Sequence, residues 1–133
     1  MKEKILIVED NLEFCHFLAY LLRSIGYEPI ETGSGEEAIA RARSDQPALI
    51  LMDIRLPGMD GVEAAAAIKQ NPDTSEIPIV ALSAYISEEW QQKAFDAGIR
   101  KYLTKPAPPQ TIKATINLIM TRESANRQRF SSL

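Results

Sequence analysis

The chain has 133 residues, of which 45% are hydrophobic and 25% are charged, and its formal net charge is -3. This length suits one domain with a single core, and the mixed charges do not indicate a protein that binds nucleic acid or an anionic membrane. No apolar stretch approaches the ~20 residues of a membrane span, and the N-terminus shows no signal-peptide pattern. Cys15 is the single cysteine, which excludes an internal disulfide. These features predict a cytoplasmic domain.

Short apolar runs alternate with helical patterns along the first third of the chain. A strand is expected at residues 4–9, followed by a helix that Asp10 or Asn11 can cap and that Gly26 ends. The apolar positions of this helix are Phe14, Phe17, Leu18, Leu21, Leu22 and Ile25. A second strand is expected at 27–32, and the short helix after it ends near Pro47.

The same alternation continues to about residue 120. Further strands are expected at residues 48–53, 77–82 and 99–103, and further helices at 62–70, 88–97 and 108–120. From Thr121 the apolar periodicity is lost. We therefore expect a domain at residues 1–121 and a frayed tail, or the start of a linker, at 122–133.

Repeated strand–helix units require right-handed crossovers and a parallel sheet covered on both faces. The predicted fold class is α/β, a flavodoxin-like doubly wound (βα)5 sandwich with strand order 2-1-3-4-5. The carboxyl ends of its strands then bring together Glu9, Asp10, Asp53, Ser83 and Lys105. Three carboxylates at one edge repel one another, and a hard divalent cation bound by oxygen ligands relieves that repulsion. The sequence thus predicts a cation site beside a hydroxyl and an ammonium group.

At these positions the chain resembles the receiver domain of two-component response regulators, the CheY-like superfamily, over about residues 2–120. The resemblance rests on Glu9-Asp10, on Asp53 within segment 51–61, on Ser83-Ala84 and on segment 102–106. It implies a phosphoacceptor switch of a two-component system or phosphorelay. Asp53 would take a phosphoryl group from a phosphohistidine on a sensor histidine kinase or a histidine phosphotransfer protein. The domain would not be an enzyme, except that it catalyses its own phosphorylation and dephosphorylation.

The resemblance also implies a ligand set for Mg²⁺, with Mn²⁺ as a possible substitute. Asp10, Asp53 and the backbone carbonyl of Arg55 would bind the ion directly, and Glu9 would act largely through water. Phosphoryl transfer needs alignment and charge neutralisation more than covalent help, and these residue types suit that task. Phosphorylation is therefore expected to depend on Mg²⁺.

Two further groups and a switch follow from the same resemblance. Ser83 and Lys105 would hold phosphoryl oxygens, and Ser83 moving inward would let Tyr102 rotate into the vacated space. This change would alter binding of a downstream protein at the face formed by the fourth helix, the fifth strand and the fifth helix, where Trp90 is a candidate. Tyr85, two residues after Ser83, is expected to hinder in-line water and lengthen the phosphoryl lifetime.

Other interpretations remain open. The chain could be a pseudo-receiver that is not phosphorylated, although such a module would lack one of the acids or the lysine, or it could regulate a longer effector protein. Gly33-Ser34-Gly35 is similar to a dinucleotide loop, but the acidic Glu36 and Glu37 would oppose a pyrophosphate there. His16 is expected to be an ordinary surface residue. No basic patch with interleaved aromatics occurs within 2–120, so direct nucleic-acid binding is not expected.

Overall fold

The computed structural model describes residues 2–131, with side chains described through residue 125. Within this range the elements are β1 (Lys4–Val8), α1 (Leu12–Ser24), β2 (Glu28–Thr32), α2 (Gly35–Asp45), β3 (Leu49–Met52), α3 (Gly61–Gln70), β4 (Ile79–Ser83), α4 (Glu88–Asp96), β5 (Lys101–Thr104) and α5 (Pro109–Ser131). All strand pairs are parallel, and the order is β2-β1-β3-β4-β5. The predicted fold class and strand order are confirmed.

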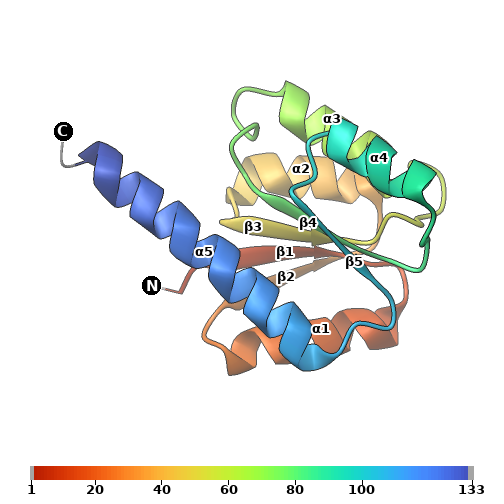
Figure 1. Ribbon diagram of the computed structural model, residues 1–133, viewed down its shortest axis with the longest axis horizontal. Helices are drawn as coiled ribbons and strands as arrows, with labels where there is room; N and C mark the ends of the chain where they lie inside the picture. Colours follow the sequence, from red (N-terminus) through yellow and green to blue (C-terminus); the bar gives the residue numbers. More distant parts are fainter. Residues whose placement is uncertain (1, 132–133) are drawn as a thin grey trace.

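Helices cover both faces of the sheet (Figure 1), and a hydrophobic layer lies between the sheet and the helices on each face. Alternate side chains of β1 point to opposite faces, so Ile5 and Ile7 pack with α1 and α5, whereas Leu6 and Val8 pack with α2, α3 and α4. The strands β1, β3 and β4 are buried almost throughout, as expected for the centre of a doubly wound sheet. This rigid centre holds the carboxyl ends of β1, β3 and β4 in place.

The last two strands begin later than the sequence predicted. Ile77 and Ile99 are buried, which explains the expectation that each would start a strand. Their backbone N–H groups instead donate to carbonyls outside the sheet, that of Ile77 to Thr74 in the preceding turn and that of Ile99 to Ala94 in α4. At both places, therefore, a buried apolar residue lies two positions before the first residue of the strand.

Two expectations for the helices were wrong. Phe17 was expected to face the core, but it is 40% exposed and stacks on Phe14, with ring centroids 6.0 Å apart. The last helix was expected to end near residue 120, but α5 continues to Ser131 (Figure 1). This extension lacks glycine and proline, and Arg100 Nη1 holds it near the sheet through Glu123 Oε1 at 2.6 Å. The helix therefore continues past the point where the apolar periodicity of the sequence is lost.

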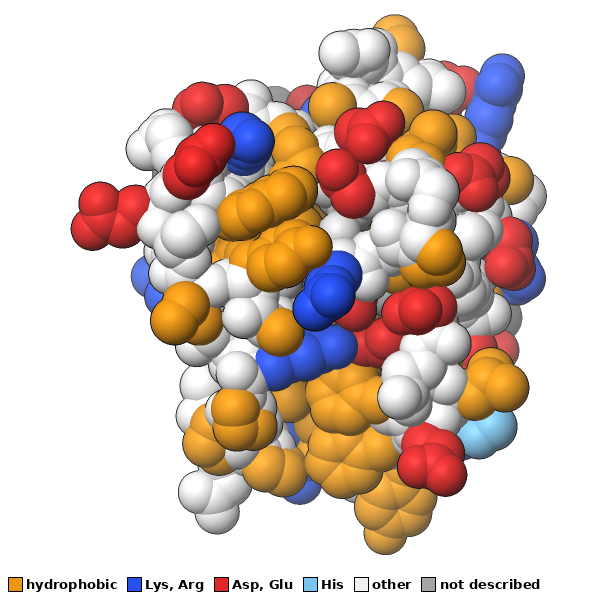
Figure 2. Space-filling view, turned by 90° about the vertical axis from the view of Figure 1, so that its right-hand side faces the viewer, with side chains coloured by type: hydrophobic (Ala, Val, Ile, Leu, Met, Phe, Trp, Pro, Cys, Tyr) orange, Lys and Arg blue, Asp and Glu red, His pale blue; other side chains and the backbone are white. Residues whose placement is uncertain are grey.

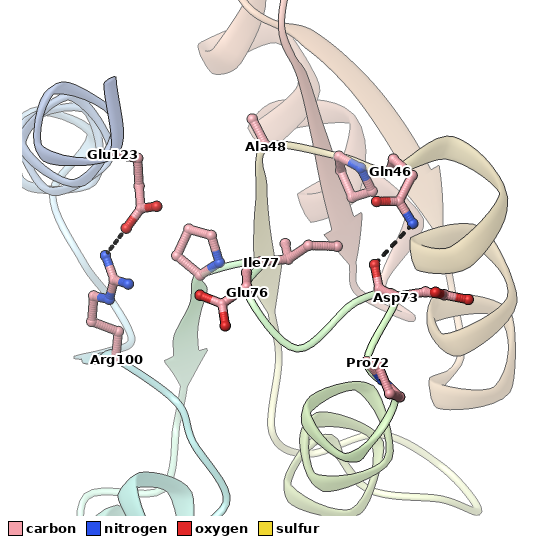
Figure 3. Close-up of a pocket in the computed structure, with 10 residues that line it drawn as sticks. Gln46, Ala48, Pro72, Asp73, Glu76, Ile77, Arg100 and Glu123 are labelled. Atoms are coloured by element: carbon pink, nitrogen blue, oxygen red, sulfur yellow. Dashed lines mark hydrogen bonds and ion pairs between the residues drawn. The ribbon is translucent and has the colours of Figure 1, made fainter. Parts of the chain in front are cut away.

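A cavity of about 500 Å³ lies at the amino-terminal edge of the sheet, opposite the edge where Asp53 follows β3. Figure 3 shows Gln46 donating to the carbonyl of Asp73 on one side and the Arg100–Glu123 ion pair on the other. Its remaining lining is mostly proline and other apolar residues, with Glu76 as an acidic member.

None of the described helices is long and apolar enough to cross a membrane.

Candidate functional site

Three carboxylates meet where β1 and β3 end side by side. Val8 and Met52 are partners in the parallel register, and the Asp53 N–H donates to the carbonyl of Val8 at 2.9 Å. One oxygen each from Glu9, Asp10 and Asp53 lies within 4.8 Å of the others. Glu9 and Asp53 are only 3% and 7% exposed, whereas Asp10 is open to solvent. The result is a mostly buried acidic cluster with one open side, as the strand order predicted.

Lys105 lies between two of these acids. Its Nζ donates to Glu9 Oε1 at 2.7 Å and to Asp53 Oδ2 at 3.3 Å. The Lys105 N–H donates to the carbonyl of Ser83 at 2.7 Å, which anchors the segment after β5 to the end of β4. The ring of Phe14 lies 4.6 Å from Nζ, a cation–π contact. Sequence reasoning placed Phe14 in the core and missed this contact, because its helical position resembles its apolar neighbours.

Burial and charge shift the pKa values of this pair. Burial raises the pKa of Glu9, and the hydrogen bond from Lys105 offsets only part of that effect. For Lys105, burial acts to lower the pKa, but the hydrogen bond to Glu9 and the charge of Asp53 outweigh it and raise the pKa. Lys105 is therefore a firmly protonated ammonium at neutral pH, beside carboxylates whose negative charge it cannot fully neutralise.

The donor set fits a hard cation. Glu9 Oε2 accepts from the Asn11 N–H at 3.0 Å, and Asp53 Oδ1 accepts from the Arg55 N–H at 3.0 Å, so both carboxylates are held in fixed orientations. Three carboxylates against one ammonium leave excess negative charge among oxygen ligands, which is the chemistry that Mg²⁺ and Mn²⁺ prefer. The buried acids therefore suit a divalent cation.

Ser83 and Tyr102 are linked through the backbone of Tyr85. Ser83 is fully buried at the end of β4, and its Oγ accepts from the Tyr85 N–H at 3.1 Å. Tyr102, half-buried in β5, donates its hydroxyl to the carbonyl of Tyr85 at 2.8 Å. A movement of the loop after β4 would therefore change the hydrogen bonds of both the Ser83 and the Tyr102 side chains.

Gly61 lets the loop after β3 close tightly behind Asp53. Its N–H donates to the carbonyl of Ile54 at 2.8 Å, and a Cβ atom there would lie 2.4 Å from the backbone oxygen of Asp53. Only glycine fits this approach without displacing the loop. The sequence carries no signal that separates Gly61 from Gly58, since both are glycines of the loop after the third strand.

The turn at residues 33–35 lies beside Glu9, since a Cβ at Gly33 would lie 3.9 Å from the Glu9 carbonyl oxygen, but it contributes no carboxylate to the acidic cluster. Ser34 caps α2 by accepting from the Glu37 N–H, and a Cβ at Gly35 would lie 3.1 Å from Met59, so Gly35 serves close packing against Met59. His16 is exposed and lies 3.3 Å from Glu31, as expected of a surface histidine.

Comparison with known proteins agrees with this geometry. The chain matches the response regulator receiver domain family over residues 5–117. It is 32% identical to protein PilH of Pseudomonas aeruginosa, covering 88% of this chain and 97% of PilH. It is also 32% identical to the phosphate regulon transcriptional regulatory protein PhoB of Escherichia coli, covering 93% of this chain but 54% of PhoB. The chain thus spans about half the length of that relative.

A solved structure is similar as well. The receiver domain of a sensor histidine kinase from Pseudomonas aeruginosa, with a magnesium ion coordinated in its active site cleft, superposes with a TM-score of 0.79 at 32% identity. The match covers 92% of this chain and 97% of that domain. The chain belongs to the response regulator receiver domains, the phosphoacceptor signalling domains of two-component systems.

Proposed function

We propose that Asp53 is the phosphoacceptor and that a phosphohistidine on a sensor histidine kinase or a histidine phosphotransfer protein is the donor. The observation that carries this assignment is the Asp53 carboxylate itself, nearly buried among two other acids with Lys105 Nζ 3.3 Å away. In the transfer, an Asp53 oxygen bonds to phosphorus while the phosphorus–nitrogen bond breaks. The bonding electron pair returns to the imidazole nitrogen of the donor.

The proposed cation ligands are Glu9, Asp10, Asp53 and the backbone carbonyl of Arg55, with Mg²⁺ as the ion and Mn²⁺ as a substitute. When bound, the ion neutralises charge on the carboxylates and on the phosphoryl oxygens. Because Lys105 already engages Glu9 Oε1, Glu9 contributes mainly through its charge and through water.

Lys105 and Ser83 are the proposed contacts to the phosphoryl oxygens. Lys105 stays positively charged at neutral pH despite its burial, because the hydrogen bond to Glu9 and the charge of Asp53 keep its pKa above the usual value. The Ser83 oxygen accepts from the Tyr85 N–H, so its own O–H can donate to a phosphoryl oxygen. These two donors and the cation would share the charge of the transferred group. The chain would catalyse only its own phosphorylation and dephosphorylation.

Signal output is proposed to pass through Ser83 and Tyr102 to a downstream protein at the face of α4, β5 and α5. Phe95 of α4 and Leu118 of α5 are large exposed hydrophobic residues on these elements, which suits a protein partner. The kinase or phosphotransfer protein is expected near α1, where Leu12, Phe17 and Tyr20 are exposed. Figure 2 shows acidic and basic side chains gathered near the centre of one face of the molecule. Hydrophobic side chains lie to the upper left of this charged cluster and below it. We expect no direct contact with nucleic acid or membrane, and a cytoplasmic location.

The alternative of a pseudo-receiver is not favoured, because all five charged and hydroxyl positions are filled. Regulation of a longer effector protein is compatible with the same switch. PhoB, which this chain matches over about half its length, is by its name a transcriptional regulator.

Phosphorylation of the purified chain by acetyl phosphate tests the proposal. Intact mass should show one added phosphoryl group with Mg²⁺, little with EDTA, and none in Asp53→Asn, whose amide keeps the shape of the side chain but cannot accept the group. Equal labelling in EDTA would contradict the cation requirement. Equal labelling in Asp53→Asn would exclude Asp53 as the acceptor.

A further inference from the structure

We propose that Trp90 of α4 is a positioning residue that sets how long the phosphoryl group stays on Asp53. It would do so by holding Tyr85 and Arg55 at the border of the site. This inference rests on the proposed function and assigns a new role to a residue outside the acidic cluster. The residues concerned, Arg55, Tyr85, Trp90 and Lys93, are named the aromatic stack below.

The aromatic stack joins three separate segments by face contacts. The rings of Tyr85 and Trp90 lie with centroids 4.7 Å apart and planes inclined by 24°. Arg55 Cζ lies 5.7 Å from the Tyr85 ring centroid, and Lys93 Nζ lies 4.9 Å from the Trp90 ring centroid. Each ring thus has one aromatic and one cationic neighbour, both favourable contacts for a π face. Each ring is also half-buried against the core layer of α2, α3 and α4.

Two members of the stack are attached directly to the site. The backbone N–H of Arg55 bonds Asp53 Oδ1 at 3.0 Å, and the backbone N–H of Tyr85 bonds Ser83 Oγ at 3.1 Å. The Arg55–Tyr85 contact therefore bridges the loops that follow β3 and β4, one carrying the proposed acceptor and the other a proposed phosphoryl contact. Figure 2 shows hydrophobic side chains against basic ones at the border of the charged cluster.

The step affected is hydrolysis of the phosphoaspartate. The oxygen of a water molecule bonds to phosphorus while the phosphorus–oxygen bond to Asp53 breaks. The electron pair returns to the carboxylate, and the proton of water passes to solvent. The water must approach in line with the breaking bond, so side chains fixed at the entrance slow the reaction. A tyrosine ring packed on Trp90 is fixed, whereas one without that neighbour can rotate away.

The stack can be observed directly, because Trp90 is the single tryptophan of the chain. Its fluorescence should change in Tyr85→Ala, which removes the stacked ring, and should be retained in Gln92→Ala. Gln92 is an exposed α4 residue outside the stack, and it donates to Asp96. Gln92→Ala is therefore the matched control for changes in α4 itself.

The decay of the phosphorylated chain tests the inference. Wild type, Trp90→Ala, Trp90→Leu, Trp90→Phe, Tyr85→Ala and Gln92→Ala are phosphorylated with acetyl phosphate, freed of the donor and followed by intact mass. Circular dichroism establishes that each variant is folded, and Trp90→Leu keeps apolar volume if Trp90→Ala unfolds. We expect Trp90→Ala and Trp90→Leu to shorten the half-life by about fivefold, the rate equivalent of one aromatic pair. Trp90→Phe should retain most of the lifetime, and Gln92→Ala all of it.

The double variant Tyr85→Ala/Trp90→Ala decides whether Trp90 acts through Tyr85. It should decay at the rate of Tyr85→Ala alone, because removing the support of an absent ring has no further effect. Multiplicative effects of the two changes, or a wild-type rate in folded Trp90→Ala and Trp90→Leu, would overturn the inference while leaving the proposed function intact. Failure of wild type to accept a phosphoryl group at all would overturn both.

Discussion

Lys105 Nζ donates a hydrogen bond to Glu9 Oε1 at 2.7 Å, although 96 positions separate the two residues in the chain. Glu9 is 3% exposed and Lys105 is 24% exposed. The ion pair therefore connects the segment after β5 to the end of β1 in a largely buried setting. Removing one member of such a pair leaves the other charge buried without its partner, which costs more than the pair itself contributes.

Lys105→Met should lower the free energy of unfolding by about 2 kcal/mol at pH 7, less than for a fully buried pair because Lys105 is partly exposed. The decrease in the free energy of unfolding caused by Lys105→Met should be smaller at pH 4 than at pH 7. Without Lys105, the pKa of Glu9 rises further above its usual value of 4.5. A carboxyl whose pKa is raised by folding stabilises the fold below its unfolded pKa, and that stabilisation is lost as the pH rises through the folded pKa. Urea unfolding at both pH values measures this.

The double variant Lys105→Met/Glu9→Gln is the control, because it removes the buried charge that the single variant leaves without its lysine. It should recover much of the lost stability at pH 7. An equal loss at pH 4 and pH 7 in Lys105→Met would show that the ionised Glu9 is not the cause.

Gly61→Ala should destabilise the domain by about 3 kcal/mol, because the added methyl group collides with backbone atoms rather than with a flexible side chain. The collision is with the Asp53 oxygen and the Ile54 Cα, at 2.4 and 2.7 Å. Gly58→Ala is the comparison, since its Cβ meets no atom within 4 Å and only its φ of +73° opposes alanine. That strain costs about 1 kcal/mol. Equal shifts in the urea midpoint would contradict the steric explanation.

Cys15 should react slowly with thiol reagents in the folded protein. Burial, with a smaller contribution from Glu31, raises its pKa to about 12. The reactive thiolate is therefore scarce at pH 8, and the side chain is also shielded within the core layer of α1 and α5. Labelling by a disulfide reagent should be roughly a hundredfold slower than in concentrated urea. Equal rates in the two conditions would mean that the α1 layer opens readily.

Lys69 should make stability rise with pH on the alkaline side. Burial lowers its pKa from 10.5, with Arg100 adding to the effect, while its ammonium donates to the carbonyls of Ser75 and Ile77. Between the lowered folded pKa and 10.5 the unfolded chain holds more protons, so the free energy of unfolding increases with pH. Lys69→Met should lose this increase in urea titrations, whereas Lys101→Met, with an exposed lysine, should keep it. A parallel pH profile in Lys69→Met would exclude Lys69 as its source.

Several site features could not be predicted because they depend on how side chains and backbone pack in three dimensions. The contact of the Phe14 ring with Lys105 joins residues far apart in the chain. The close approach of Gly61 to Asp53 and the stacking of Trp90 on Tyr85 are local in sequence, but they depend on loop geometry and ring orientation that residue patterns do not specify. Phe14 and Phe17 occupy similar places in a helical pattern, yet only the tertiary structure leaves Phe17 exposed. The length of α5 also escaped prediction, because the apolar periodicity of the sequence ends near Thr121 whereas the helix continues, with Arg100 paired to Glu123 on its extension.

The sequence by itself determined the fold class and the residues at the carboxyl edge. Apolar runs and helical periodicity are local properties that can be recognised in the sequence. Strand order 2-1-3-4-5 makes the first and third strands neighbours, which brings Glu9, Asp10 and Asp53 together at their carboxyl ends. Only the tertiary structure decided which oxygen of each carboxylate Lys105 engages and which ring supports Tyr85. Those choices depend on side-chain packing and desolvation across elements, which no local pattern in the chain encodes.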